Sequence, residues 1–180
     1  NDTLEAVIQG PAERLKLAQE LSNEHLQQVR QQKNIMLAES AQEMQESIAK
    51  SDEARKEFDT SFTAVTAIAT EQGKVLWNKL AGFTTEFRKQ DDRIRALMLA
   101  NNRPMAMQIA SNEVRTATND IDALLTEVVT LETTRLRDAD LQADEDYVQT
   151  RLVMIAVAAT ALLIAIAAAF WIAISINAGL

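Results

Sequence analysis

Hydrophobic residues run almost without interruption near the end of the chain, over residues 152–174, where Thr160 is the only polar residue. A helix of this length reaches about 34 Å, slightly more than the roughly 30 Å hydrocarbon core of a bilayer. The run contains no charged residue, and one central Asp or Arg would oppose insertion by about 3 kcal/mol. A fully buried core helix of a globular protein is the alternative, but such helices seldom run this long without a charge. The pattern therefore predicts a transmembrane helix over residues 152–174.

Before this run, apolar residues recur every three or four positions, which is the period of an amphipathic helix. The pattern predicts helices over residues 3–38, 42–69, 73–101 and 104–151. The predicted breaks fall at residues 39–42, 70–73 and 101–104. Gly10-Pro11 predicts a kink or a late start in the first helix, because proline lacks an amide donor and collides with the preceding turn.

Polar residues interrupt the apolar seams of the predicted helices at only a few places. Ser51 and Arg55 interrupt the second seam, and Gln90 interrupts the third. The fourth seam has no polar interruption and consists of Met107, Ala110, Val114, Ala117, Ile121, Leu124, Val128 and Leu131. Seams of this kind are typical of helices that pack on one another.

The fourth helix has no stop signal before the membrane run, because residues 136–151 contain neither Gly nor Pro. We therefore expect it to continue into the bilayer. Short connections make neighbouring helices antiparallel. The predicted fold is all-α: an antiparallel up-down-up-down four-helix bundle over residues 1–151, whose last helix continues into a transmembrane helix.

Composition excludes several other classes of protein. Four glycines, two prolines and 4% aromatic residues are poor material for a sheet protein with many turns. A net charge of −8 and a pI near 4.7 argue against nucleic acid as a partner, since phosphate binding needs clustered Lys and Arg. The chain has no cysteine, which removes disulfides and most structural zinc sites.

The sequence also bears on topology. The chain starts without Met inside helical sequence, so we expect it to be a fragment of a longer protein. Acidic residues outnumber basic ones just before the membrane run, which disfavours a cytoplasmic location for the bundle. The acidic residues concerned are Asp138, Asp140, Asp144, Glu145 and Asp146.

Catalytic patterns are absent from the sequence, so we predict no enzyme, no cofactor and no metal site. His25 is the only histidine, and we interpret it as a surface or bundle-seam residue. No nucleophile elbow, P-loop or paired-histidine pattern occurs. Acidic clusters such as Asp91-Asp92 are interpreted as solvated helix faces, because adjacent helical residues do not converge on a metal.

A ligand site is more plausible between helices, where bundles usually build them. Two polar groups lie about ten residues from the predicted distal turns, one on the first helix and one on the fourth, and therefore at similar heights. The candidate ligand-binding residues are Arg30, Lys33, Asn34, Asn112, Arg115, Thr116 and Asn119. An anion such as a carboxylate would suit them, with Arg giving a bidentate contact. The alternative is ordinary surface charge, interspersed with Glu113 and Asp120.

The chain resembles the four-helix-bundle sensory ectodomain of bacterial methyl-accepting chemotaxis receptors, a domain also found on some sensor histidine kinases. The resemblance rests on VRQQKNIML at residues 29–37, DDRIRAL at residues 91–97, and a last helix that enters a membrane span. The end of the chain resembles the start of a HAMP linker, predicted over residues 175–180, through Ile172, Ser175, Ile176 and Leu180, although Gly179 stands where that pattern usually has Pro.

This resemblance implies a homodimer in the inner membrane, with a periplasmic sensor domain that responds to a small molecule or a periplasmic binding protein. It also implies signalling by small movements of the fourth helix toward a cytoplasmic module for chemotaxis. Two other functions fit the same pattern: the ectodomain of a sensor histidine kinase, and a tail-anchored structural coiled coil that faces the cytosol. A membrane-bound enzyme is a third and weaker alternative.

Overall fold

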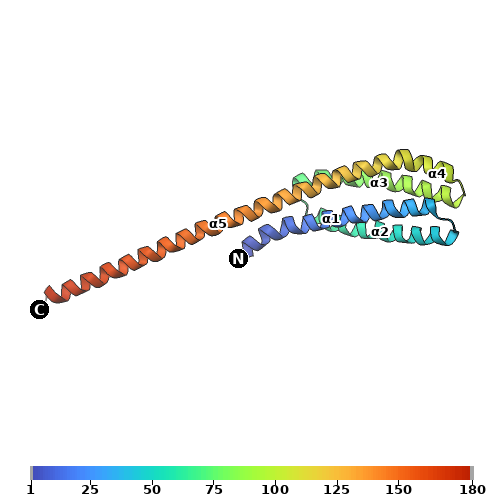
Figure 1. The fold of residues 1–180 in the computed structure, drawn as a ribbon. Coiled ribbons are helices and arrows are strands. Elements are labelled where there is room, and N and C mark those ends of the chain that lie inside the picture. The colour runs from blue at the N-terminus through green and yellow to red at the C-terminus, as the bar shows by residue number, and fades with distance from the viewer. Residues whose placement is uncertain (1, 179–180) are drawn as a thin grey trace. The chain divides into compact units, whose positions relative to one another are not determined.

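The computed structural model describes residues 2–178, and within that range it contains helices and no strand. The all-helical prediction is therefore confirmed. The elements are α1 (Asp2–Leu37), α2 (Ala41–Ala67), α3 (Glu71–Leu99), α4 (Arg103–Ile109), the π-helical turn η1 (Ala110–Val114) and α5 (Arg115–Ala178) (Figure 1). The chain forms two units, a first unit up to Leu136 and a second from Arg137, whereas the predicted sensor domain extends to residue 151.

Side-chain caps start three of these helices close to the predicted breaks. Ser40 Oγ accepts a hydrogen bond from the Glu43 amide at 3.2 Å, and Thr70 Oγ1 accepts one from the Gly73 amide at 3.1 Å. Asn102 caps α4 in the same way, one residue after Asn101 takes a positive φ of 57°. At the other end of the first unit, α1 runs from Asp2 through Pro11, so of the two outcomes predicted at Gly10-Pro11 the late start does not occur, and the kink stays a prediction.

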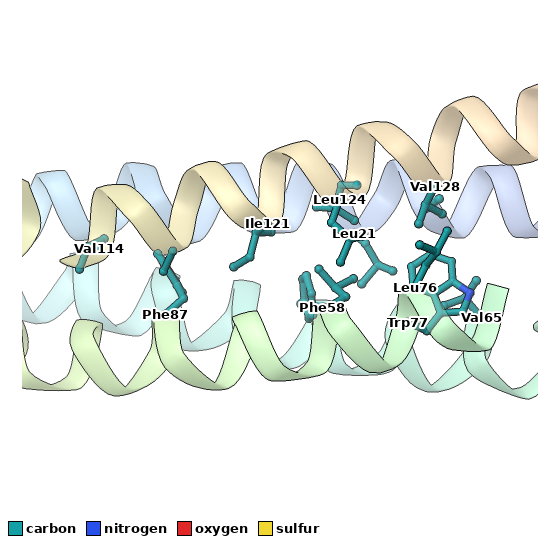
Figure 2. Close-up of a cluster of buried hydrophobic side chains, with 14 of the residues drawn as sticks. Leu21, Phe58, Val65, Leu76, Trp77, Phe87, Val114, Ile121, Leu124 and Val128 are labelled. Atoms are coloured by element: carbon teal, nitrogen blue, oxygen red, sulfur yellow. The ribbon is translucent and has the colours of Figure 1, made fainter. Parts of the chain in front are cut away.

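In the first unit, α1, α2, α3 and the segment from α4 into α5 run side by side (Figure 1) and share one hydrophobic core (Figure 2). The largest fully buried apolar side chains are Trp77, Phe58, Phe87, Leu21, Ile35, Leu80, Ile94, Ile121 and Val65. Burial of each such side chain contributes about 1.5–3 kcal/mol relative to exposure. Every helix of the first unit therefore depends on the others for its stability.

The π turn η1 shifts the buried face of the fourth predicted helix by one residue. Before it, Ala106 and Ile109 are buried; the next buried residues are Val114, the last residue of η1, and Ala117 after it. The step from 109 to 114 is one residue longer than an α-helical seam allows. Met107, which the uninterrupted seam placed in the core, is consequently 58% exposed, so that part of the prediction is wrong.

Deletion of Ser111, an exposed residue of η1, should convert the π turn into an ordinary α turn with both buried faces in phase. We expect this variant to keep a cooperative thermal transition by circular dichroism. Deletion of the exposed Asp120 from the regular part of α5 is the matched control. This deletion rotates the part of α5 on one side of residue 120 by about 100° relative to the part on the other side. The core residues of the two parts can then no longer face the core together, so cooperative unfolding should be lost. If both deletions abolished the cooperative thermal transition to the same extent, η1 would not contain one residue more than an α-helical turn needs.

The second unit consists of the rest of α5, and the large apolar side chains whose burial is described there are exposed. Those described as exposed in the apolar run are Leu152, Val153, Met154, Ile155, Val157, Leu162, Leu163, Ile164, Ile166 and Trp171. Among the described residues, one helical stretch, Arg103–Ile166, is long and apolar enough by length and composition to cross a membrane. The most apolar part of this stretch is fully exposed, whereas the core helix of a soluble protein is mostly buried.

Candidate functional site

The seven predicted ligand residues are all exposed on the first unit. On α1, Arg30 and Lys33 point away from the buried side, and the Asn34 side-chain amide donates to Gln31 Oε1 at 3.0 Å. Across the described part of the chain, no hydrogen bond or ion pair joins this group to Asn112, Arg115, Thr116 or Asn119. The joint site therefore stays a prediction.

Three residues of the second group do come together, in a groove of about 480 Å³ beside α3. Asn112, Arg115 and Thr116 line it together with Phe83 of α3, and Asn119 is not part of this lining. The Asn112 amide already donates to the Gln108 carbonyl at 3.0 Å, and the Thr116 hydroxyl donates to the Asn112 carbonyl at 3.1 Å. Asn112 keeps one further N–H, so the Arg115 guanidinium is the only charged donor among these three residues.

The charges around this groove do not favour an anion. Glu86, Glu113 and Asp120 line it as well, so three carboxylates face the one guanidinium of Arg115. A hydrogen bond from the Gln90 side chain lowers the pKa of Glu86, so Glu86 is ionised at neutral pH. A negatively charged ligand would meet net repulsion here. The prediction of an anion site is thus not supported by the local charge balance.

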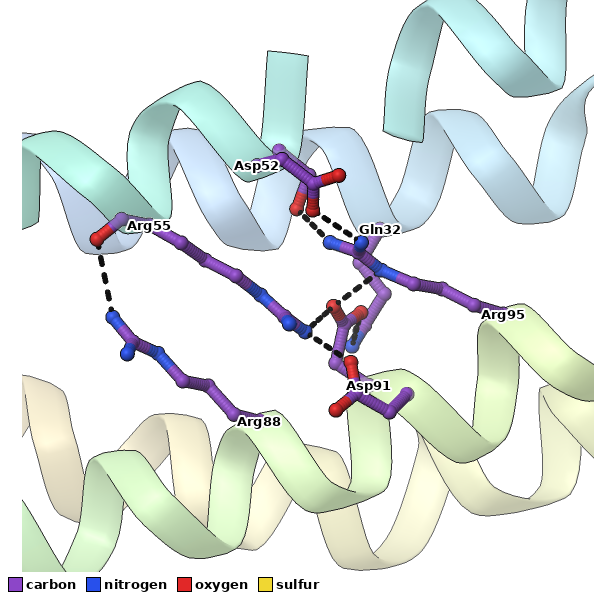
Figure 3. A network of polar contacts seen from close by, with 8 residues as sticks. Gln32, Asp52, Arg55, Arg88, Asp91 and Arg95 are labelled. Atoms are coloured by element: carbon purple, nitrogen blue, oxygen red, sulfur yellow. Dashed lines mark hydrogen bonds and ion pairs between the residues drawn. The ribbon is translucent and has the colours of Figure 1, made fainter. Parts of the chain in front are cut away.

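One cluster of polar side chains in the first unit, centred on Asp91, joins three helices by hydrogen bonds, and the sequence analysis did not predict this cluster. Asp91 of α3 is 1% exposed, which makes the solvated-face interpretation wrong for this residue, although the neighbouring Asp92 is 61% exposed at its side chain. Asp91 accepts hydrogen bonds from Gln32 of α1 at 2.8 Å, from Arg55 of α2 at 2.5 Å and from Arg95 of α3 at 2.9 Å (Figure 3). We call these four residues the Asp91 network.

Arg95 extends the Asp91 network to two more residues of α2. Its guanidinium donates to Asp52 Oδ1 at 2.5 Å and to Ser51 Oγ at 2.6 Å, and Ser51 is fully buried. Charge-assisted bonds of this kind are the strong ones, and here they satisfy a buried carboxylate from three helices. The sequence signal was present in Ser51 and Arg55, the two polar interruptions of the second seam.

A second buried carboxylate ties α1, α5 and the connection between α2 and α3 together. Glu132 is 1% exposed and accepts from Arg14 Nε at 2.8 Å and from Arg135 at 3.0 Å. The Arg135 guanidinium also donates to Thr70 Oγ1 at 2.6 Å and to Gln72 Oε1 at 2.9 Å. Both buried acids thus fix the packing of the helices and leave little capacity for a ligand.

His25 lies between these two networks and is 2% exposed, so it is a seam residue and not a surface residue. Its ring meets Phe87 edge to face at 5.1 Å between centroids. Nε2 has no hydrogen-bond partner and lies 3.7 Å from Asp122 Oδ1, which exceeds hydrogen-bond distance. Burial lowers the pKa of His25 to about 4, so the imidazole is neutral at pH 7.

The polar groups of the first unit thus divide into two kinds. The buried carboxylates Asp91 and Glu132 are satisfied by helix-to-helix contacts, whereas the predicted ligand residues lie on the surface. Comparison with known proteins adds no relative from which a ligand or activity could be inferred. No protein family, no curated protein and no solved structure matches this chain.

Proposed function

We propose that this chain is the sensory domain and the following transmembrane helix of a bacterial receptor of the chemoreceptor type. In this proposal the first unit is an antiparallel up-down-up-down four-helix bundle that responds to a small molecule or a periplasmic binding protein. The observation that carries the proposal is the extent of α5, one helix whose residues include the core positions Ile121 and Leu124 and the exposed apolar run from Leu152.

A continuous helix is a plausible relay for a binding signal. A ligand that prefers one packing of the core shifts the population toward it, by an amount set by its differential affinity. Such a change can reach the bilayer through α5 only if no flexible break intervenes, and α5 is helical from Arg115 to Ala178. The output is then a cytoplasmic chemotaxis module or a kinase downstream of a HAMP linker. Of the HAMP-like residues, Gly179 and Leu180 lie outside the described residues.

A homodimer in the inner membrane, with its sensor domain in the periplasm, completes the proposal. An exposed apolar side chain supports the dimer: Leu26 of α1 is 56% exposed and lines a groove with Leu125 and Val129 of α5. Aliphatic residues in such a position favour contact with another helical surface. The acidic residues before the span support an external location of the domain only weakly, because positive charge decides orientation.

Labelling of single cysteines tests the topology, and the chain has no native cysteine to interfere. We expect a membrane-impermeant maleimide to label Lys50→Cys on intact spheroplasts, because Lys50 is exposed on α2, away from the groove around Leu26. A cysteine added after Leu180 is the matched control and should react only after lysis. The reverse pattern would contradict the receptor and would support a tail-anchored protein that faces the cytosol.

A further inference from the structure

A groove of about 490 Å³ lies between α1 and α5 in the first unit. The apolar residues that line it are Leu26 of α1 and Leu125 and Val129 of α5. Leu26 is 56% exposed, so its apolar side chain is open to a ligand in the groove. On α5 the lining extends from Asp122 to Thr130, which is about 12 Å of helix. We call this space the Leu26 groove.

Of the described residues that line the Leu26 groove, Asp122 alone is charged. Its side chain is 49% exposed, so a ligand in the groove can reach the carboxylate. Within the described part of the chain, the one ion-pair contact of Asp122 is to His25, at 3.7 Å. Burial lowers the pKa of His25 to about 4, so the imidazole is neutral at pH 7. The Asp122 carboxylate therefore has no cation to balance it.

The buried His25 ring lies behind the Asp122 carboxylate. It is 2% exposed, and its Nε2, which has no hydrogen-bond partner, is the atom 3.7 Å from Asp122 Oδ1. A ligand in the groove cannot reach Nε2, so the binding surface ends at Asp122. Burial raises the pKa of the Asp122 carboxyl, because part of its hydration is lost and no cation replaces it. A cation on the open side of Asp122 would replace that hydration.

The hydroxyl groups that line the groove are already bonded within their own helices. Ser22 Oγ donates to a carbonyl of α1 at 3.1 Å, and the Thr126 and Thr130 hydroxyls each donate to the carbonyl four residues earlier at 2.8 Å. The other polar side chains of the lining, Gln19 and Asn23, are uncharged amides. A ligand thus meets one ionised acceptor, apolar surface and no charged donor. This combination favours a cation with an apolar tail and disfavours an anion.

We propose that the Leu26 groove binds a primary ammonium ion with a short aliphatic chain, of about the length of hexylammonium. The ammonium group donates to the Asp122 carboxylate, and the chain packs along α5 against Leu26 and Val129. This site contains none of the seven residues predicted from the sequence. Binding in the groove does not depend on the receptor function, but it uses the same surface as the proposed dimer, so the two are measured separately below.

The test uses the whole chain, ¹³C-labelled at its Leu and Val methyl groups, in nanodiscs of phosphatidylcholine. Hexylammonium should shift the methyl NMR signals of Leu26 and Val129 saturably, with the free probe concentration measured by dialysis. The methyl signals of Val75 are the internal control, because Val75 is 57% exposed but lines a different groove. They should not shift. This local signal separates binding in the Leu26 groove from partition of the probe into lipid.

Three further probes separate the charge from the tail. We expect hexanol to bind with a Kd about tenfold higher than that of hexylammonium, because it cannot form the charge-assisted hydrogen bond to Asp122. Methylammonium should also bind about tenfold more weakly than hexylammonium, because it has no chain to remove from water. Hexanoate should give no saturable shift, because its carboxylate meets that of Asp122.

Asp122→Asn removes the charge and keeps the shape of the side chain. This variant should lose the tenfold preference for hexylammonium over hexanol and should keep hexanol binding. Asp120→Asn is the matched control, because Asp120 is exposed on the same helix but lines a different groove. It should leave the preference unchanged. Circular dichroism checks the fold of each variant.

Three results would overturn the ammonium site. The first is the absence of a saturable shift at Leu26 and Val129 in the unmodified chain. Native mass spectrometry of the same nanodiscs counts the chains, so a groove covered by a second copy is distinguished from an open groove that does not bind. The second is equal affinity for hexanol and hexylammonium, which would contradict the charge argument. The third is an equal loss of preference in Asp122→Asn and Asp120→Asn, which would remove the assigned role of Asp122.

Discussion

Replacement of Asp91 by alanine is expected to lower the free energy of unfolding by about 3–5 kcal/mol, the cost of breaking a buried ion pair from one side. Asp91 is the shared acceptor for Gln32, Arg55 and Arg95. The side chains of the two arginines are only 18% and 12% exposed, so water cannot replace the lost carboxylate freely. Urea unfolding of the chain in nanodiscs, followed by circular dichroism, measures the change.

Asp92→Ala is the matched control, because Asp92 follows Asp91 in the same helix and contacts the same arginine. Its carboxylate lies 2.8 Å from an Arg55 nitrogen, but its side chain is 61% exposed. Exposed ion pairs contribute at most about 1 kcal/mol, so this variant should unfold almost like the unmodified chain. If Asp91→Ala and Asp92→Ala lowered the free energy of unfolding by similar amounts, burial would not be the reason that the Asp91 carboxylate stabilises the fold.

The helices could be predicted from the sequence because their apolar positions repeat at helical spacing. The few polar residues that interrupt the apolar seams marked the positions of buried hydrogen bonds between helices. Ser51 and Arg55 interrupt the second seam, and both belong to the buried contacts around Asp91 and Arg95. A polar residue at a core position needs a hydrogen-bond partner from another helix, but a single sequence does not indicate which helix provides that partner.

The π turn could not be predicted, because nothing in the composition of Ala110–Val114 distinguishes it from an α-helix. Its extra residue decides which side of α4 is buried, and therefore why Met107 is exposed and Ala106 is not.

The candidate ligand site was argued from heights along two helices, which fix distance from a turn but not the direction of a side chain. Arg115 lies in a groove with Phe83 and Glu86 of α3, whereas Arg30 is exposed on α1. Height alone could not supply the rotation of each helix about its axis. The spacing of apolar residues indicates which side of a helix faces the core, but it does not indicate which neighbouring helix an exposed polar residue lies beside. Sites made of exposed polar residues are therefore the hardest to predict.

His25 is expected to make the chain less stable in acid. Burial lowers its pKa from 6.5 to about 4, so between these values the unfolded chain binds a proton that the folded chain does not. Stability is therefore complete above pH 6.5 and is lost as the pH falls through 6.5 toward about 4. The difference in pKa corresponds to a loss of about 3 kcal/mol.

Asp122 does not offset this loss. It lies 3.7 Å from Nε2, and its negative charge would favour a protonated imidazole. Burial raises the pKa of the Asp122 carboxyl, however, and its side chain is 49% exposed, so water screens its attraction for an imidazolium. The 2% exposure of His25 leaves no room for water to solvate an imidazolium. Desolvation is therefore the dominant effect, and protonation should open the contact between His25 and Phe87.

The comparison with His25→Leu isolates this effect from the other groups that titrate in acid. Urea unfolding of both proteins between pH 7.5 and pH 4 should give a constant stability difference above about pH 6.5. Below that value the unmodified chain should lose about 3 kcal/mol more than the variant by pH 4. A stability difference that stays constant down to pH 4, or an NMR titration of His25 near pH 6.5, would show that water reaches the imidazole and that the core opens around it.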